Sequence, residues 1–347
     1  MTGLLEMREK LRTFYGKYEL YVTAGLKFVL GLVVFSVING NIGYMERLNQ
    51  PAAVLLLSLL CAFFPINAMV VLACGLILLH LFAVSMEACA IGLCLFLLLL
   101  FLYGKFAPGN GYSAILTTVL CFFRVPQVMP AAVGMLKGPS AYFSVLCGTV
   151  TYYYLRGVQD NLVNFTSTEE TEGLAKFTAA LKIFTGNKEM YLVLAAFLVT
   201  SLTVYLIRRQ AISHAWRAAM VVGNVLQLII FLLGYILLDL TDRILWVFAG
   251  ILISMAVCLV LEFFLYNLDY SRVERVQFED DEYYYFVKAV PKVFVAKKEK
   301  RVKRITARKR TTVGRRELAE ELDIDQDRKS TRLNSSHTLS SSMPSSA

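Results

Sequence analysis

Apolar stretches long enough to cross a membrane recur along this sequence from Tyr21 to Tyr266. The hydrocarbon core of a bilayer is about 30 Å thick, so a helix needs roughly 20 apolar residues to cross it. Lipid offers the backbone no hydrogen-bonding partner, so such stretches are expected to be helical. With 57% hydrophobic and 18% charged residues, the composition departs from that of soluble domains in the same direction. The sequence therefore predicts an all-α polytopic integral membrane protein.

The apolar sequence divides into ten segments of unequal length. In the middle of the chain they are shorter than a straight crossing needs, and Arg124 with Pro126, and Lys137 with Pro139, separate them. Short helices interrupted by proline occur in transporters and where protein shields the backbone from lipid. We expect about ten crossings, or eight to nine if two short segments form one kinked or re-entrant unit. The segments are residues 21–38, 51–64, 68–86, 88–103, 112–123, 125–136, 141–155, 190–207, 220–238 and 244–266.

The charged residues predict how the chain is oriented. We expect a cytosolic N-terminus (1–20), a first membrane block (21–156), an extracytosolic loop (157–189), a three-helix membrane block (190–266) and a cytosolic tail (267–326). Ten crossings place the N-terminus, Lys105, Lys137, the "RRQAISHAWR" loop and the tail on one face, and the "TEETE" sequence on the other. Basic loops stay in the cytosol, which predicts that both termini are cytosolic, although Arg124 and Arg156 oppose the trend. No A-x-A-like site follows the first segment, so we expect an uncleaved anchor.

The loop between the two membrane blocks carries a helical pattern. Ser167 and Glu170 have the spacing of a capping box, and Gly186 suits a helix end. The pattern predicts an amphipathic helix on the membrane surface or over the mouth of a cavity. Its apolar stripe consists of Leu174, Phe177, Leu181 and Phe184.

The tail after residue 266 changes in character. "RVERVQF" and "YYYFVKAV" flank the acidic sequence "EDDE" and are rich in β-forming residues, which predicts a β-hairpin. An isolated hairpin is only marginally stable in water. We therefore expect it to rest on the membrane block, a second copy or a partner.

Residues 297–316 hold eleven Lys or Arg against one Glu. Three interpretations remain open: charge that enforces orientation, attraction to anionic lipids, and contact with nucleic acid, which no accompanying fold supports. We expect no nucleic acid. The short acidic helix expected in "RRELAEELDID" has Leu318 and Leu322 available for a partner. The candidate lipid or partner contacts are Lys297, Lys298, Lys300, Arg301, Lys303, Arg304, Arg308, Lys309 and Arg310.

The last 21 residues resemble the translation of a common sequencing-library adapter. The match runs from Asp327 to His337 without a mismatch, and the final "SSMPSSA" differs from the adapter's later part at one residue. This segment is set aside from fold reasoning. It contributes three positive charges and one negative charge, so the net charge of +9 falls to +7 without it. We also expect that the natural C-terminus is missing. Whether a soluble domain was lost with it stays open.

Four ionisable residues within or beside the apolar segments are candidates for an intramembrane polar site, because a charge in a span is costly and usually faces protein or water. Lys27 lies at a depth from which it can snorkel to the cytosolic face. His80 is either a hydrogen-bonded structural residue or part of a proton or cation path. Glu87, seven positions on and on the same helical face, is expected to mark the water interface. Arg124 lies between two short helices, so it either anchors the chain at the interface or holds an anionic group.

Other polar features predict packing rather than chemistry. Asn224 and Gln227 are expected to hydrogen-bond a neighbouring helix. The cysteines lie in apolar segments without metal-binding spacing. We therefore expect them to be small side chains at helix contacts, with no disulfide and no bound metal. Enzyme signatures such as H-E-x-x-H, G-x-S-x-G and the Walker loop are absent, so neither catalysis nor a cofactor is expected. The cysteines are Cys61, Cys74, Cys89, Cys94, Cys121, Cys147 and Cys258.

The stretches "MREKLRTFYGKYELY" and "RVERVQFEDDEYYYFVKAVPK", with the short-helix block, resemble a family of multi-pass membrane proteins of anaerobic Gram-positive bacteria. The likeness covers nearly all of residues 1–326. It implies location in a bacterial cytoplasmic membrane and no particular activity.

The leading hypothesis from the sequence is a non-enzymatic component of envelope assembly, a scaffold whose tail binds a cytosolic protein. One alternative is a transporter or permease subunit with a polar site near Arg124. A second alternative is the membrane-sensing half of a C-terminally truncated signalling protein.

Overall fold

The computed structural model describes residues 2–166, 178, 181–265 and 274–289. The chain divides into two compact units, residues 1–295 and 296–347, and the second lies outside the described residues. The basic segment, the helix expected in "RRELAEELDID" and the adapter-like end all belong to that second unit. Most of the amphipathic helix expected in the 157–189 loop is also outside the described residues.

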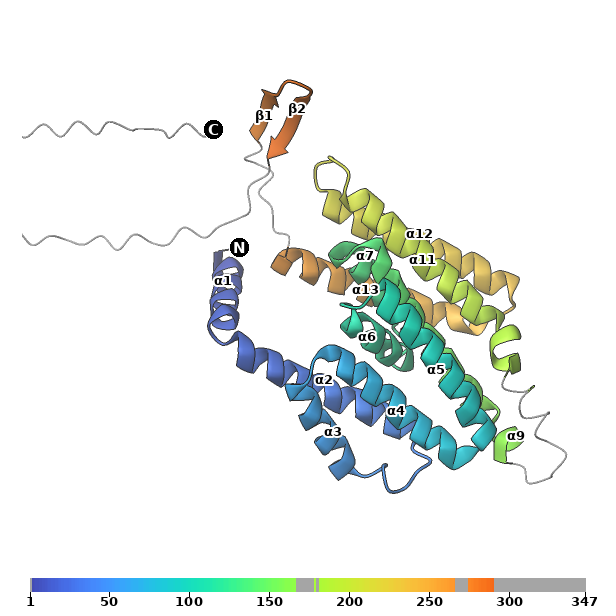
Figure 1. The fold of residues 1–347 in the computed structure, drawn as a ribbon. Helices are drawn as coiled ribbons and strands as arrows, with labels where there is room; N and C mark the ends of the chain where they lie inside the picture. The colour runs from blue at the N-terminus through green and yellow to red at the C-terminus, as the bar shows by residue number, and fades with distance from the viewer. Residues whose placement is uncertain (1, 167–177, 179–180, 266–273, 290–347) are drawn as a thin grey trace, which may run out of the picture. The chain divides into compact units, whose positions relative to one another are not determined.

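The described part is helical apart from one small sheet (Figure 1). Its membrane block contains ten helices that match the ten apolar segments in order, preceded by an N-terminal helix. The elements are α1 (Thr2–Lys17), α2 (Glu19–Ile42), α3 (Pro51–Phe63), α4 (Ile66–Val84), α5 (Met86–Phe106), α6 (Gly111–Phe122), α7 (Val128–Leu136), η1 (Pro139–Ala141), α8 (Tyr142–Asp160), α9 (Leu162–Thr166), α11 (Lys188–Arg208), α12 (Ala215–Leu237), η3 (Thr241–Arg243), α13 (Ile244–Leu265), β1 (Glu274–Glu279) and β2 (Tyr284–Ala289).

Six of these helices, α2, α4, α5, α11, α12 and α13, are long and apolar enough to cross a membrane. They indicate a membrane protein, but the count of ten crossings is not confirmed. Of the four other helices, α8 has 19 residues but is less apolar, and α3, α6 and α7 are too short. With 13, 12 and 9 residues, they rise only about 20, 18 and 14 Å at 1.5 Å per residue.

Hydrogen bonds between helix ends place several termini on one face of the bundle. Lys27, in the first third of α2, donates to the carbonyl of Phe64, where α3 ends and α4 is about to begin. Asn67 at the start of α4 donates to Pro108, just beyond the end of α5. Arg8 of α1 donates to the carbonyl of Phe263 near the end of α13. We call this the first face; α2, α4 and α6 begin there, and α3, α5 and α13 end there.

The opposite, second face collects the other ends. Gln159, next to last in α8, donates to Asn41 near the end of α2, and Tyr154 donates to Ala88 in the first turn of α5. Because α8 ends at the second face, its beginning points toward the first face, and α7 ends only a few residues before it. Helices α6 and α7 therefore form a helical hairpin that begins and ends toward the first face, with its tip at residues 123–127.

Helix α7 is buried along almost its whole length, from Val128 to Met135. It packs among α11, α12 and α13 (Figure 1). Pro130 is tolerated because it lies in the first turn, where a backbone N–H has no helical partner to lose. Gly134 allows close approach to α11, since a Cβ there would lie 2.8 Å from Val204 Cβ and 2.9 Å from the Ser201 carbonyl oxygen.

The predicted β-hairpin is confirmed as an antiparallel pair in which Val276 opposes Val287 and Phe278 opposes Tyr285. The turn is organised by Asp280. One carboxylate oxygen accepts from the backbone N–H groups of Glu282 (3.0 Å) and Tyr283 (2.7 Å), and the other accepts from the Tyr285 hydroxyl (2.8 Å). These three hydrogen bonds lower the pKa of the Asp280 carboxyl, and the same contact raises the pKa of Tyr285.

Candidate functional sites

His80 is fully buried in α4 and uses both ring nitrogens. The backbone N–H of Met45 donates to Nδ1 at 3.2 Å, and Nε2 lies 3.0 Å from Asn39 Oδ1. A backbone N–H can only donate, so Nδ1 carries the lone pair and Nε2 carries the proton that is donated to Asn39. Asn39 in turn donates to the carbonyl of Leu48. The neutral ring thus fastens the loop between α2 and α3 against α2 and α4.

Glu87 lies in the first turn of α5 and is half-buried, whereas His80 belongs to α4, so the two residues do not share a helical face as expected. Ser85 caps this helix, accepting from the N–H of Ala88 at 3.0 Å. A carboxylate in the first turn is favoured by the helix dipole. This position gives Glu87 a structural role at the start of α5.

Lys27 donates from Nζ to the carbonyl of Phe64 at 3.2 Å, just after the last residue of α3. Helix C-terminal carbonyls lack an intrahelical donor and carry partial negative charge. The ammonium group therefore meets the end of a short helix at the first face, the face toward which the snorkelling interpretation points it.

Arg124 is exposed at the tip of the α6–α7 hairpin, in the left-handed conformation (φ 61°). The N–H of Val125 donates to Leu120 at 2.9 Å, which closes the end of α6. The guanidinium lies 5.1 Å from the centre of the Trp246 ring in α13, a distance suited to a cation–π contact. The cation thus sits at the carbonyl end of α6 and keeps an exposed side.

The tip of the hairpin also brings Gln127 into the interior, a residue that sequence reasoning passed over. Gln127 is 5% exposed, its carbonyl accepts from Ser254 of α13 at 3.2 Å, and its amide lies where a Cβ on Gly250 would be. A polar residue beside Pro126 in a short apolar segment was the available signal.

Asn224 and Gln227 of α12 are fully buried. Asn224 Nδ2 donates to the Met220 carbonyl of its own helix at 2.8 Å, and the Asn224 side chain also hydrogen-bonds the Cys258 thiol of the neighbouring α13. Within the described part of the chain, four buried amide atoms have no hydrogen-bond partner: Gln127 Oε1, Asn224 Oδ1 and both Nε2 and Oε1 of Gln227. Such groups are costly in an apolar interior. These atoms belong to the residue just before α7 and to α12, two elements that pack against each other.

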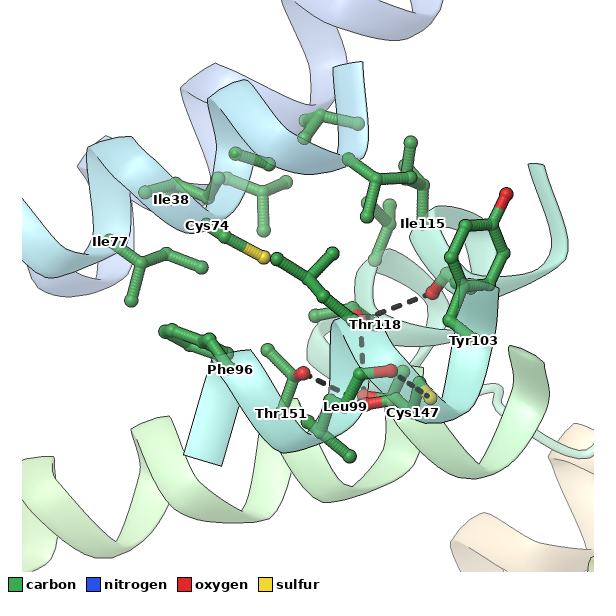
Figure 2. A pocket seen from close by; sticks show the side chains of 18 of the residues that line it. Ile38, Cys74, Ile77, Phe96, Leu99, Tyr103, Ile115, Thr118, Cys147 and Thr151 are labelled. Carbon is green, nitrogen blue, oxygen red and sulfur yellow. Dashed lines mark hydrogen bonds between the residues drawn. The ribbon is translucent and has the colours of Figure 1, made fainter. Parts of the chain in front are cut away.

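A cavity of about 70 Å³ lies between α2, α4, α5, α6 and α8. Figure 2 shows Phe96, Ile77 and Ile115 around it, with two thiols, Cys74 and Cys147. No sequence pattern predicted this cavity, because its walls come from five separate segments. Its lining is almost entirely apolar.

The remaining residues predicted from the sequence are the basic residues of the tail and the cysteines. The nine basic residues proposed for lipid or partner contact lie outside the described residues. Every cysteine is unpaired, and four of them, Cys61, Cys121, Cys147 and Cys258, are buried. In the described residues, no group of three His, Cys, Asp or Glu side chains is arranged to hold a metal ion.

Comparisons of the chain with models of protein families, with curated proteins and with solved structures found no match. The resemblance to multi-pass proteins of anaerobic Gram-positive bacteria stays a prediction. Function has to be argued from the geometry of the chain itself.

Proposed function

We propose that this protein is a non-enzymatic membrane scaffold of the bacterial envelope, whose membrane block anchors a cytosolic hairpin that binds a partner protein. The observation that supports the proposal is an uncovered apolar face on the hairpin. Val276, Phe278, Tyr285 and Val287 project from that face and are 47%, 51%, 38% and 42% exposed. A two-stranded sheet gains little stability alone, so such a face is expected to be covered in use.

The ring arrangement favours a protein partner. Phe278 and Tyr285 stack at 4.9 Å between ring centres, with an interplanar angle of 19°. Paired aromatic residues flanked by valines form the rigid apolar centre that protein interfaces prefer. The opposite face alternates polar with aromatic residues, namely Gln277, Glu279, Tyr284 and Phe286.

The test compares two faces of the same strand. Phe278→Ser removes an aromatic anchor, whereas Gln277→Ser changes the opposite face and serves as the control. In cross-linking pull-downs from membranes, we expect the proteins captured by the wild type to be lost with Phe278→Ser and kept with Gln277→Ser. Equal capture by both variants would contradict the proposal, as would unchanged capture after deletion of residues 267–326.

A transporter or permease subunit is the second candidate. It is supported by the unpartnered amide atoms beside the α6–α7 hairpin, because short buried helices and polar groups at membrane depth are features of transporter sites. Arg124→Ala and Gln227→Leu should each reduce uptake of a solute by vesicles while leaving membrane insertion intact. If no solute gradient responds to the wild-type protein, this candidate fails.

A further inference from the structure

The cavity between α2, α4, α5, α6 and α8 is lined by a few polar side chains. Their hydrogen-bond donors already meet backbone carbonyls. Thr118 donates to the carbonyl of Gly148 at 3.0 Å, and Thr151 donates to that of Cys147 at 2.8 Å. The Cys147 thiol lies 3.5 Å from the Leu99 carbonyl. These contacts are the dashed lines of Figure 2. A polar ligand would find no partner here, whereas an apolar one would lose nothing.

The wall of the cavity extends along two of the helices. On α4 its wall runs from Val70 to Ile77 and on α5 from Phe96 to Tyr103, which is about 10 Å of helix rise in each case. An apolar cavity of this kind stays dry and accepts apolar molecules. A chain of methylene groups fits a narrow apolar space of this length better than a compact ring does.

The cavity is closed at one end and not sealed at its side. Near the first face, the Tyr103 hydroxyl lies 2.5 Å from Asn67 Oδ1 and 3.0 Å from the Pro108 carbonyl oxygen, either of which can accept its proton. This polar cluster caps the cavity. Half-buried residues, among them Val37 and Leu100, belong to its lining. Three of the five helices are long and apolar enough to span the membrane, so the medium outside is hydrocarbon.

We propose that this cavity binds a segment of one acyl chain of a bilayer phospholipid, a few methylene groups that enter from the side between the helices. The bound segment fills the space among α2, α4, α5, α6 and α8 and supports the packing of α6, the first helix of the helical hairpin. The site is independent of any partner that binds the β-hairpin.

The test uses the full protein in phospholipid nanodiscs containing a phosphatidylglycerol that carries a photoactivatable diazirine midway along one acyl chain. Ala73→Leu places extra bulk at the cavity wall, and Ala83→Leu, on an exposed part of the same helix, is its matched control. Mass spectrometry should find labelled Ile77 and Ile115 in the wild type and in Ala83→Leu. In Ala73→Leu this labelling should fall about tenfold, since the added side chain displaces two or more methylene groups, with labelling of exposed Leu79 unchanged.

Two results would overturn the proposal. In the first, the wild type is labelled at Leu79 but not at Ile77 and Ile115, and the Ala73→Leu variant has raised thermal stability. This is the behaviour of an empty void. The other is equal labelling of the cavity residues in Ala73→Leu and wild type. Should Ala73→Leu fail to insert, Ile115→Phe fills the same space from α6 and is judged by the labelling of Ile77.

Discussion

His80 shows how one buried residue can hold three segments together. Replacing it with leucine leaves Asn39 Oδ1 and the Met45 N–H without their partners. Each buried polar group without a partner costs about 1–3 kcal/mol, so with two such groups we expect His80→Leu to lower the free energy of unfolding by at least that amount. His80→Gln can donate and accept at similar positions and should lose less. Thermal unfolding in detergent micelles measures both, and equal losses would contradict the proposed hydrogen-bonding role.

Asp280 should make the hairpin turn sensitive to acid. Hydrogen bonds from the Glu282 N–H, the Tyr285 hydroxyl and the Tyr283 N–H lower its pKa below the usual value of about 3.9. The charged form therefore stabilises the turn above that pH, and the contribution is lost as the pH falls through the lowered pKa. NMR signals of the Glu282 and Tyr283 amides should shift in this acidic range. Asp280→Asn should abolish the shift, and Asp281→Asn should leave it in place.

Helix α7 depends on a glycine for its place beside α11. A Cβ at Gly134 would lie 2.9 Å from a backbone oxygen, that of Ser201, which cannot rotate away. We expect Gly134→Ala to destabilise the protein by about 1–3 kcal/mol through overpacking. Gly75→Ala in α4 is the control, because nothing lies within 4 Å of its added methyl group and alanine favours a helix. Unfolding of both variants in the same micelles would test this, and a neutral Gly134→Ala would contradict it.

At the scale of elements, the sequence predicted each apolar segment and the hairpin, because long apolar runs and β-rich flanks around "EDDE" are local signals. It could not predict which short helices cross the membrane. That depends on α6 and α7 packing against distant helices, as when Arg208 of α11 donates to carbonyls at the end of α7. For the same reason Gln127 and the cavity were missed. Both are assembled from residues far apart in the chain, and neither leaves a periodic pattern.

The molecule as a whole has a topology that can be tested through its loops. Because α6 begins beside the start of α4, and α7 ends close to the beginning of α8, the loops before α6 and after α7 belong to the first face, with α1 and the end of α13. Both termini of the membrane block then lie on one side whether the hairpin counts as two crossings or none. The basic residues Lys105 and Lys137 also belong to that side, which the positive-inside rule assigns to the cytosol.

Labelling with a membrane-impermeant maleimide would measure this arrangement in oriented membrane vesicles. Asn110→Cys and Lys137→Cys should react from the cytosolic side, and Glu46→Cys, in the loop that His80 fastens at the second face, should react only from the opposite side. The native thiols lie within helices of the membrane block, where a water-soluble reagent has little access. If Lys137→Cys and Asn110→Cys reacted from different sides, α7 would have to end at the second face, and the helical hairpin would be wrong. Reaction of both from the cytosolic side, with Glu46→Cys opposite, would leave the short helices as one hairpin that holds Arg124 and Gln127 at its tip.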